Sequence, residues 1–308
     1  MVAALKPLIV VAGPTASGKT ALAIALAEKF NGEIVSCDSV AVYREMEIGT
    51  AKPTHEDRAR VPHHCLDLYN PDEACTAGDY ARHAREALAG IADRGRVAIV
   101  TGGTGLYLRA LVDGLFAGPP RSEGLREKLR SRESAHLHKI LRRLDAGAAA
   151  KIHANDAPKL IRAIEVCIAG RQKISEAWLE GRDALTGYTV LRLGLNPARG
   201  LLYERINSRA AAMFARGLVE ETRVLVERYT YDCRPLTSLG YAQAVAVLRD
   251  QLTMEQAVVA AQQGHRNYAK RQLTWFRKDA EMRWLDGCGD HAETLRSASA
   301  MVQEFLRA

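Results

Sequence analysis

The chain is 308 residues long, with 47% hydrophobic and 26% charged residues and a formal net charge of +7. This composition is typical of a globular protein with a sizeable core, and the length favours one α/β domain that carries a smaller second element. No apolar stretch approaches the roughly 20 residues that a membrane span needs, and the apolar start of the chain runs directly into a phosphate-binding motif. We therefore expect a cytoplasmic protein with no signal peptide and no contact with a membrane.

The six cysteines lie far apart, and no C-x-x-C pair occurs among them. This spacing offers neither a zinc-ligand pattern nor a disulfide framework. We expect reduced thiols without a chemical role at Cys37, Cys65, Cys75, Cys167, Cys233 and Cys288.

The first predicted element is a strand at residues 7–12, followed by the motif GPTASGKT and a predicted helix at 19–30. The spacing G-x-x-x-x-G-K-T is the P-loop pattern, in which backbone N–H groups and a helix N-terminus converge on phosphate oxygens. Lys19 adds a positive charge, and the Thr20 hydroxyl can ligate Mg²⁺. The sequence therefore predicts phosphate or diphosphate binding, but it does not predict nucleotide hydrolysis. The predicted binding residues are Gly13, Pro14, Thr15, Ala16, Ser17, Gly18, Lys19 and Thr20.

Strands and helices alternate after this motif. A second strand is predicted at 33–38, and a helix at 78–95 leads into an apolar, β-branched strand at 96–100. This alternation predicts an α/β fold, a P-loop NTPase-like parallel sheet with helices on both faces.

The middle of the chain changes character near Gly118, where strand signals stop and apolar residues recur at helical spacing. Residues 121–200 contain 16 Lys and Arg against 9 Asp and Glu, an excess of +7, whereas the rest of the chain is neutral, with 27 of each. A basic segment beside a phosphate-binding core suggests a polyanionic partner, although a solvated helical surface explains the charge equally well.

A strand at 189–197 returns to the sheet, and two long helical patterns and a short strand, MRWLD, follow it. We therefore expect three segments: a first part of the core at 1–118, a helical, basic insertion at 119–187, and a second part of the core at 188–308.

A carboxylate stands at the end of the second strand. A P-loop ATPase or GTPase normally places an acidic Mg²⁺ ligand at the end of an apolar strand, but the strand at 96–100 ends in Thr101 and two glycines. Asp38 is the best-placed alternative, as a general base beside the P-loop, as a Mg²⁺ ligand through water, or as a turn cap. The residues alone leave these three roles open.

Five blocks of the sequence resemble a known family. The blocks are DSVAVYREMEIGTAKP at 38–53, VPHHCLD at 61–67, TGGTGLYLRAL at 101–111, HANDAPKLIRAIEV at 153–166 and NYAKRQLTWFRKD at 267–279. They look like the characteristic blocks of the tRNA dimethylallyltransferases, also called tRNA isopentenyltransferases, and they occur in the family's order. The resemblance covers most of the chain from Pro7 to Asp279, and its first block is long and specific.

The resemblance implies a reaction: transfer of a dimethylallyl group from dimethylallyl diphosphate to the N6 amine of adenosine 37 in tRNA, with release of diphosphate. The P-loop and Mg²⁺ at Thr20 would stabilise the charge that grows on the leaving diphosphate. Because an adenine amine is a weak nucleophile, it needs a base, which we assign to Asp38. By resemblance, Thr104 lies near the diphosphate and the reacting base, and Arg223 contacts the diphosphate. Taken alone, Thr104 fits a helix N-cap and Arg223 a solvated helix residue.

The resemblance also implies contacts with the tRNA anticodon stem-loop, from which adenosine 37 is extruded. The implied contact residues are Asp38, Ser39, Val40, Ala41, Thr104, Arg126, Pro158, Lys159, Leu160, Ile161, Arg162, Gly240 and Tyr241. This sequence departs from the family at Ala41, where Gln is frequent, and at Pro158-Lys159, where Gln-Arg is frequent, which removes an amide and a forked guanidinium. Tyr241 suits stacking on a base and packing under a helix equally well.

The last block is basic and aromatic. We expect Trp275 and Phe276 in the core and the charged residues Lys270, Arg271, Arg277 and Lys278 toward RNA. We expect His63 and His64 to be structural, because no further zinc ligands stand at suitable spacing.

Two enzyme classes and one binding protein compete with this interpretation. An adenylate isopentenyltransferase acts on free AMP, ADP or ATP with the same donor, but it gives no reason for the basic segment. A P-loop small-molecule kinase would need ATP and a phosphate acceptor near Asp38. An RNA-binding module with a vestigial P-loop would not need intact Lys19 and Thr20. We expect a monomer without an obligatory protein partner.

Overall fold

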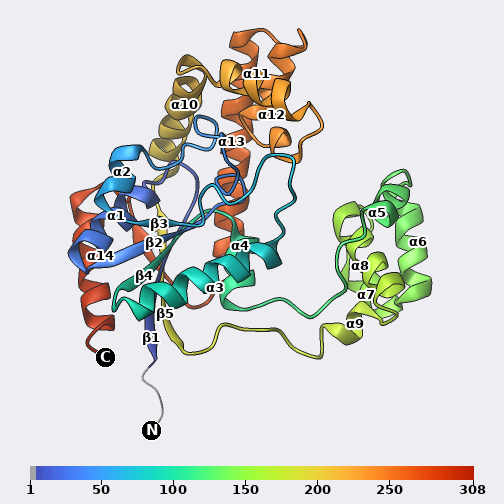
Figure 1. Cartoon of the computed structure of the whole chain (residues 1–308), viewed down its shortest axis with the longest axis horizontal. Coiled ribbons are helices and arrows are strands. Elements are labelled where there is room, and N and C mark those ends of the chain that lie inside the picture. The colour runs from blue at the N-terminus through green and yellow to red at the C-terminus, as the bar shows by residue number, and fades with distance from the viewer. Residues whose placement is uncertain (1–4) are drawn as a thin grey trace. The chain divides into compact units, whose positions relative to one another are not determined.

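The structure is a computed structural model that describes residues 5–308. It divides into two compact units, of which the larger comprises residues up to Leu111 together with Leu185–Ala308. A six-stranded parallel sheet lies at the centre of this unit (Figure 1), in the order β3-β2-β4-β1-β5-β6. Its strands are β1 (Lys6–Ala12), β2 (Gly32–Cys37), β3 (His63–His64), β4 (Val97–Gly102), β5 (Tyr188–Asn196) and β6 (Met282–Asp286). The two-residue edge strand β3 was not predicted.

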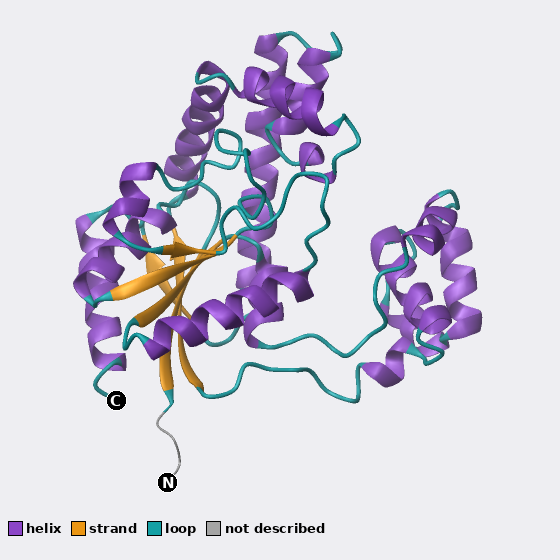
Figure 2. Ribbon diagram, viewed as in Figure 1, coloured by secondary structure: helices purple, strands orange, loops and turns teal. Residues whose placement is uncertain are grey.

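Helices cover both faces of the sheet, as Figure 2 shows. On one face, Ile9 and Val11 of β1 pack into a buried cluster with α1 (Lys19–Lys29) and α14 (Ala292–Phe305). Successive strand residues point to opposite faces, and α3 (Ala77–Asp93) packs against β2 and β4 on the other side. The predicted class, a parallel α/β sheet flanked by helices, is confirmed.

Four longer helices follow β5: α10 (Arg199–Ala215), α11 (Leu218–Tyr229), α12 (Tyr241–Leu248) and α13 (Met254–Phe276). α10 packs along α13, and α11 packs along α12. α13 begins with a capping box in which the Thr253 hydroxyl accepts from Gln256 N at 3.3 Å. The remaining elements of the larger unit are α2 (His55–Arg60) and α4 (Gly105–Val112), which precede β5, and the 3₁₀ turn η1 (Arg234–Thr237).

The second unit, Val112–Ala184, is helical. Its helices are α5 (Glu123–Arg130), α6 (Ser134–Leu144), α7 (Ala146–Lys151), α8 (Ala157–Ala169) and α9 (Ile174–Ala177). They enclose a core of their own, in which Leu137, Leu141 and Leu160 are fully buried. The basic insertion expected at 119–187 lies almost wholly within this unit. Among residues 5–308, no helix has the length and apolar character that a membrane crossing requires.

Candidate active site

The P-loop connects β1 to α1 and takes its shape from left-handed backbone positions. Ala16 has φ 62° and Gly18 has φ 84°. Gly18 must be a glycine, because a Cβ there would lie 2.8 Å from the backbone nitrogen of Gly289 as well as requiring a strained φ. α1 begins directly after it at Lys19, whose Nζ donates to Pro14 O at 2.6 Å.

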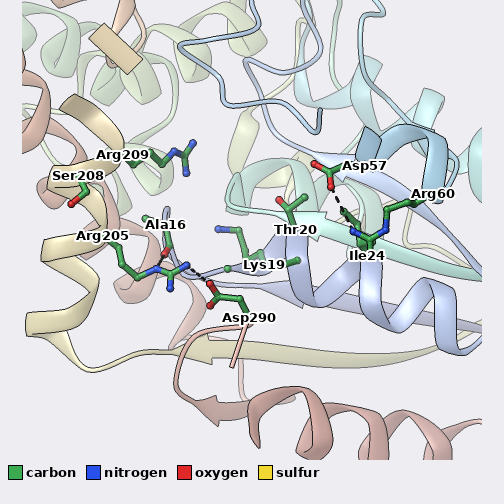
Figure 3. A pocket seen from close by; sticks show the side chains of 12 residues that line it. Ala16, Lys19, Thr20, Ile24, Asp57, Arg60, Arg205, Ser208, Arg209 and Asp290 are labelled. Atoms are coloured by element: carbon green, nitrogen blue, oxygen red, sulfur yellow. Dashed lines mark hydrogen bonds and ion pairs between the residues drawn. The ribbon is translucent and has the colours of Figure 1, made fainter. Parts of the chain in front are cut away.

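Two cations share the space in front of this loop. The Arg209 side chain of α10 donates to Thr15 Oγ1 at 3.2 Å, and Figure 3 shows Arg209 and Lys19 pointing into the same space. Enclosure by protein atoms, together with the nearby Arg209 charge, lowers the pKa of Lys19 to about 7. Burial also lowers the pKa of Arg209. The Asp38 carboxylate partly offsets these shifts in both groups, although neither cation forms an ion pair within residues 5–308. An anionic ligand bound in this space would compensate the two positive charges.

Two cavities meet at these cations. An open cleft of about 670 Å³ is lined by α1, α2 and α10 residues (Figure 3), and a narrower pocket of about 110 Å³ lies at the ends of β2 and β4. Lys19, Thr20 and Arg209 line both cavities, whereas Asp38 lines only the pocket. The side chains of Lys19, Thr20 and Arg209 therefore lie between the open cleft and the narrower pocket that contains the Asp38 carboxylate.

Asp38 forms a turn directly after β2. Its Oδ1 accepts from Val40 N at 2.8 Å and from Ala41 N at 3.1 Å. Among the described residues, both of these donors approach Oδ1, which leaves Oδ2 available to a substrate. The predicted turn-cap role is present, and it is compatible with a role as base because a different oxygen would serve each.

Thr104 lies beside this turn because β2 and β4 are neighbours in the sheet. Its Oγ1 accepts from Ser39 N at 3.1 Å, and its backbone nitrogen donates to Cys37 O at 3.3 Å. The close approach of the two strand ends requires glycine at 102, where a Cβ would lie 2.0 Å from Cys37 O. The structure therefore brings Asp38, Ser39 and Thr104 together.

α13 supplies two pocket residues that the sequence interpretation missed. Gln272 donates from Nε2 to Gly103 O at 2.9 Å and accepts Thr15 N at Oε1 at 2.8 Å, so it braces the P-loop against the glycine turn after β4. Tyr268 lines the same pocket, and burial raises the pKa of its phenol to about 12. Both residues stand in the block at 267–279 that we assigned to an RNA surface. Arg209 was missed as well, since a single arginine in a helical pattern gives no signal.

Three residues of the larger unit line neither cavity. Arg223 is exposed on α11, where it pairs with Glu220 at 3.2 Å, and it lines neither cavity. Tyr241 is fully buried and donates to Glu221 at 2.6 Å, so its ring packs inside the protein instead of offering a stacking surface. Trp275, expected in the core, is 37% exposed. Its ring lies against Gly105 of α4, and the Arg109 guanidinium is 4.4 Å from the ring centroid. Phe276 is buried as expected.

In the helical unit, the implied RNA contacts divide into exposed and buried groups. Pro158 and Lys159 are exposed at the start of α8, whereas Leu160 and Ile161 are buried and offer RNA no side-chain surface. Arg126 pairs with the buried Glu165 at 2.7 Å, and Arg162 reaches the same carboxylate at 2.6 Å. These hydrogen bonds lower the pKa of Glu165 to about 2, despite burial.

His63 lines the same pocket as Asp38, whereas His64 and the cysteines do not. His63 Nδ1 lies 2.7 Å from Val61 O, and His64 lies 2.7 Å from the Glu33 carboxylate. The cysteines are free, and burial raises the pKa of Cys37 and Cys65 to about 12, which keeps both thiols protonated.

The fold and the pocket define a P-loop enzyme with a carboxylate beside its phosphate site. A family model described as IPP transferase matches residues 41–279, and one described as Isopentenyl transferase matches residues 6–71. A tRNA dimethylallyltransferase of Koribacter versatilis is 63% identical over 96% of this chain and 98% of its own length. One of Solibacter usitatus is 51% identical over 97% and 99%. The chain belongs to the tRNA dimethylallyltransferase (IPP transferase) family.

Solved structures agree. The tRNA isopentenylpyrophosphate transferase of Bacillus halodurans matches with a TM-score of 0.73 and 34% identity, over 98% of this chain and 97% of that one. A eukaryotic dimethylallyltransferase acting on tRNA matches with a TM-score of 0.85 and 27% identity, over 98% of this chain and 80% of that one.

Proposed function

We propose that this enzyme transfers the dimethylallyl group of dimethylallyl diphosphate to N6 of adenosine 37 in cytoplasmic tRNA and releases diphosphate. The observation that carries the proposal is one pocket, lined by the P-loop cation Lys19, by Arg209 and by the carboxylate of Asp38. Relatives that share 63% and 51% of its residues are named tRNA dimethylallyltransferase.

The donor diphosphate would bind the P-loop amides, Lys19 and Arg209. Allylic C–O bonds break readily when the leaving diphosphate is stabilised. Two partly buried cations that form no ion pair within residues 5–308 are suited to that charge. The resemblance adds Arg223, which would have to leave its surface pair with Glu220 to reach the donor.

Mg²⁺ fits the residues present. The Thr20 hydroxyl lies at the edge of the pocket, and the buried Thr101 hydroxyl, which lines the same pocket, has no hydrogen-bond partner within residues 5–308. Thr20 would hold the ion, and Thr101 and Asp38 would contact its water shell. When bound, Mg²⁺ would neutralise charge on the diphosphate.

The acceptor chemistry would belong to Asp38. The N6 lone pair forms the new N–C bond as the C–O bond of the donor breaks, the bonding electrons leave with diphosphate, and the N6 proton passes to Asp38 Oδ2. Thr104 and Ser39 would hold the turn so that this oxygen faces the pocket.

The residues at 119–187 would bind the anticodon stem-loop through their basic surface, with Pro158 and Lys159 at the exposed start of α8. Arg126 and Arg162 would act partly through their ion pairs with Glu165. Ser39, Val40, Ala41 and Gly240 remain implied contacts of the target loop.

Incubation of the protein with Mg²⁺, radiolabelled dimethylallyl diphosphate and either unmodified tRNA or AMP tests the proposal. Label at adenosine 37, without ATP, would support it. Label on AMP alone would mean that the protein transfers the same group to a free nucleotide and not to tRNA, as an adenylate isopentenyltransferase does. Label on neither acceptor, with ATP consumed, would favour a kinase.

A further inference from the structure

The loop that follows the Asp38 turn builds one wall of the pocket at the ends of β2 and β4. Residues Thr50, Ala51, Lys52 and Pro53 line this pocket, on the same stretch of chain as Asp38 and Ala41. The stretch 38–53 contains no helix or strand of its own, apart from an isolated bridge at Tyr43. The position of the wall therefore depends on contacts with other parts of the larger unit.

Glu221 of α11 provides such a contact. Its carboxylate accepts three consecutive backbone N–H groups, from Glu47 at 3.2 Å, Ile48 at 2.8 Å and Gly49 at 3.4 Å. Successive amides that point at one carboxylate form an anion-binding nest, and hydrogen bonds to a charged acceptor are stronger than neutral ones. The carboxylate thus fixes the backbone immediately before the wall begins at Thr50.

Tyr241 of α12 orients the Glu221 carboxylate. Its hydroxyl donates to Glu221 Oε1 at 2.6 Å, and its ring lies against Gly49, where an added Cβ would be 2.4 Å from Cε2. Tyr241 is fully buried, so the Glu221 carboxylate is oriented by a side chain that cannot easily move away.

Two further contacts hold the same loop. Arg228 and Tyr229, also on α11, bind the Glu45 carboxylate, the latter at 2.8 Å. Inside the loop, the buried Lys52 ammonium donates to Tyr43 O at 2.7 Å and to Asp67 at 2.6 Å. Side chains of α11 therefore bind the loop at Glu45 and at 47–49, and the hydrogen bonds of Lys52 hold the C-terminal end of the loop.

We infer that Glu221 is a positioning residue for the acceptor nucleotide, an inference that rests on the proposed function. It touches no substrate. Acting through the backbone of 47–49, with Tyr241 orienting its carboxylate, it sets the wall formed by Thr50–Pro53 opposite the target adenosine. Among the described residues, Glu221 makes no hydrogen bond to the P-loop or to Arg209, so its loss should affect the acceptor more than the donor.

The test compares Glu221→Gln with Glu227→Gln, a matched loss of charge at an exposed position of the same helix. The amide keeps the size of the side chain but replaces one of the two accepting oxygens with a donor, which faces an N–H group in this nest. We expect Glu221→Gln to lower kcat/KM for tRNA by about tenfold, with the affinity for dimethylallyl diphosphate unchanged. Backbone amides at 47–49 should exchange hydrogen faster in Glu221→Gln than in Glu227→Gln.

Each outcome decides between alternatives. Equal kcat/KM for tRNA in the two variants, or a parallel loss of donor affinity, would overturn the inference. If Glu221→Gln does not fold, Tyr241→Phe keeps the ring packing, removes one hydrogen bond to the carboxylate, and should produce a smaller shift in the same direction. No shift in Tyr241→Phe would then count against the inference. Failure of the wild-type protein to label tRNA would instead overturn the proposed function.

Discussion

Replacement of Arg209 by Met should weaken donor binding and shift its pH dependence. The guanidinium lies beside the P-loop and forms no ion pair with any residue from 5 to 308, and methionine occupies a similar space without the charge. A hydrogen bond to a charged group contributes roughly 1.5–3 kcal/mol, so the affinity for dimethylallyl diphosphate should fall by roughly ten- to a hundredfold. Isothermal titration without tRNA measures this affinity, with Arg216→Gln at the exposed end of α10 as the control.

The pH dependence follows from Lys19. Burial and the Arg209 charge lower its pKa to about 7, so the ammonium form that binds diphosphate is present below pH 7 and is lost as the pH rises. Removal of Arg209 removes a like charge and raises this pKa, so the decline in affinity should begin at a higher pH in the variant. The ionisation of the donor is common to both proteins and cancels in the comparison.

Two results would refute this reasoning. One is an unchanged affinity in Arg209→Met, which would place the diphosphate elsewhere in the cleft. The other is a decline that begins at the same pH in both proteins, which would mean that Arg209 does not act on Lys19. Arg223→Ala, titrated in parallel, should show the smaller loss, because that side chain is exposed and paired with Glu220.

Asp38→Asn should abolish prenyl transfer because the amide cannot accept the N6 proton. The affinities for tRNA and donor should stay nearly unchanged, since the amide oxygen still accepts the turn hydrogen bonds. Single-turnover rates close to wild type would show that Asp38 is not the base. Gln272→Leu should lower kcat without changing tRNA affinity, because it removes the side-chain hydrogen bonds to Thr15 of the P-loop and to Gly103 of the turn after β4. Steady-state kinetics that match wild type would contradict this prediction. Lys159→Glu should weaken tRNA binding and reduce its salt slope by about 1; identical binding across a salt titration would move the RNA surface elsewhere. Arg126→Ala should destabilise the helical unit by about 3 kcal/mol, because it leaves the buried Glu165 carboxylate short of a partner, and an unaltered melting curve would oppose that reading.

The sequence predicted those parts of the site that depend on strand ends. Asp38 and Thr104 follow two apolar strands, and the carboxyl ends of parallel strands meet at one edge of a sheet. The P-loop motif fixes its own local geometry, and Lys19 and Thr20 line the same pocket as Asp38. The strands at 7–12 and 33–38 match β1 and β2 to within a residue or two.

The helical contributions were not predictable in the same way. Gln272 reaches a loop 169 positions earlier in the chain, and Arg209 one 194 positions earlier. Periodicity identifies which helix face is apolar, but it does not say against which loop the polar face will lie. For the same reason the burial of Tyr241 and the exposure of Trp275 depend on how α11, α12 and α13 pack, which no local pattern encodes.

The brace at Gln272 has a consequence for redesign. Because a single amide on α13 holds the donor loop and the glycine turn at once, the gap between them is set by a helix that belongs to neither loop. Under the proposed function, changes within the P-loop would chiefly alter how tightly the diphosphate is held, whereas a change at position 272 would alter the space between the two loops. An engineer who seeks a bulkier alkyl donor should therefore vary α13 around position 272 first and leave the phosphate loop intact.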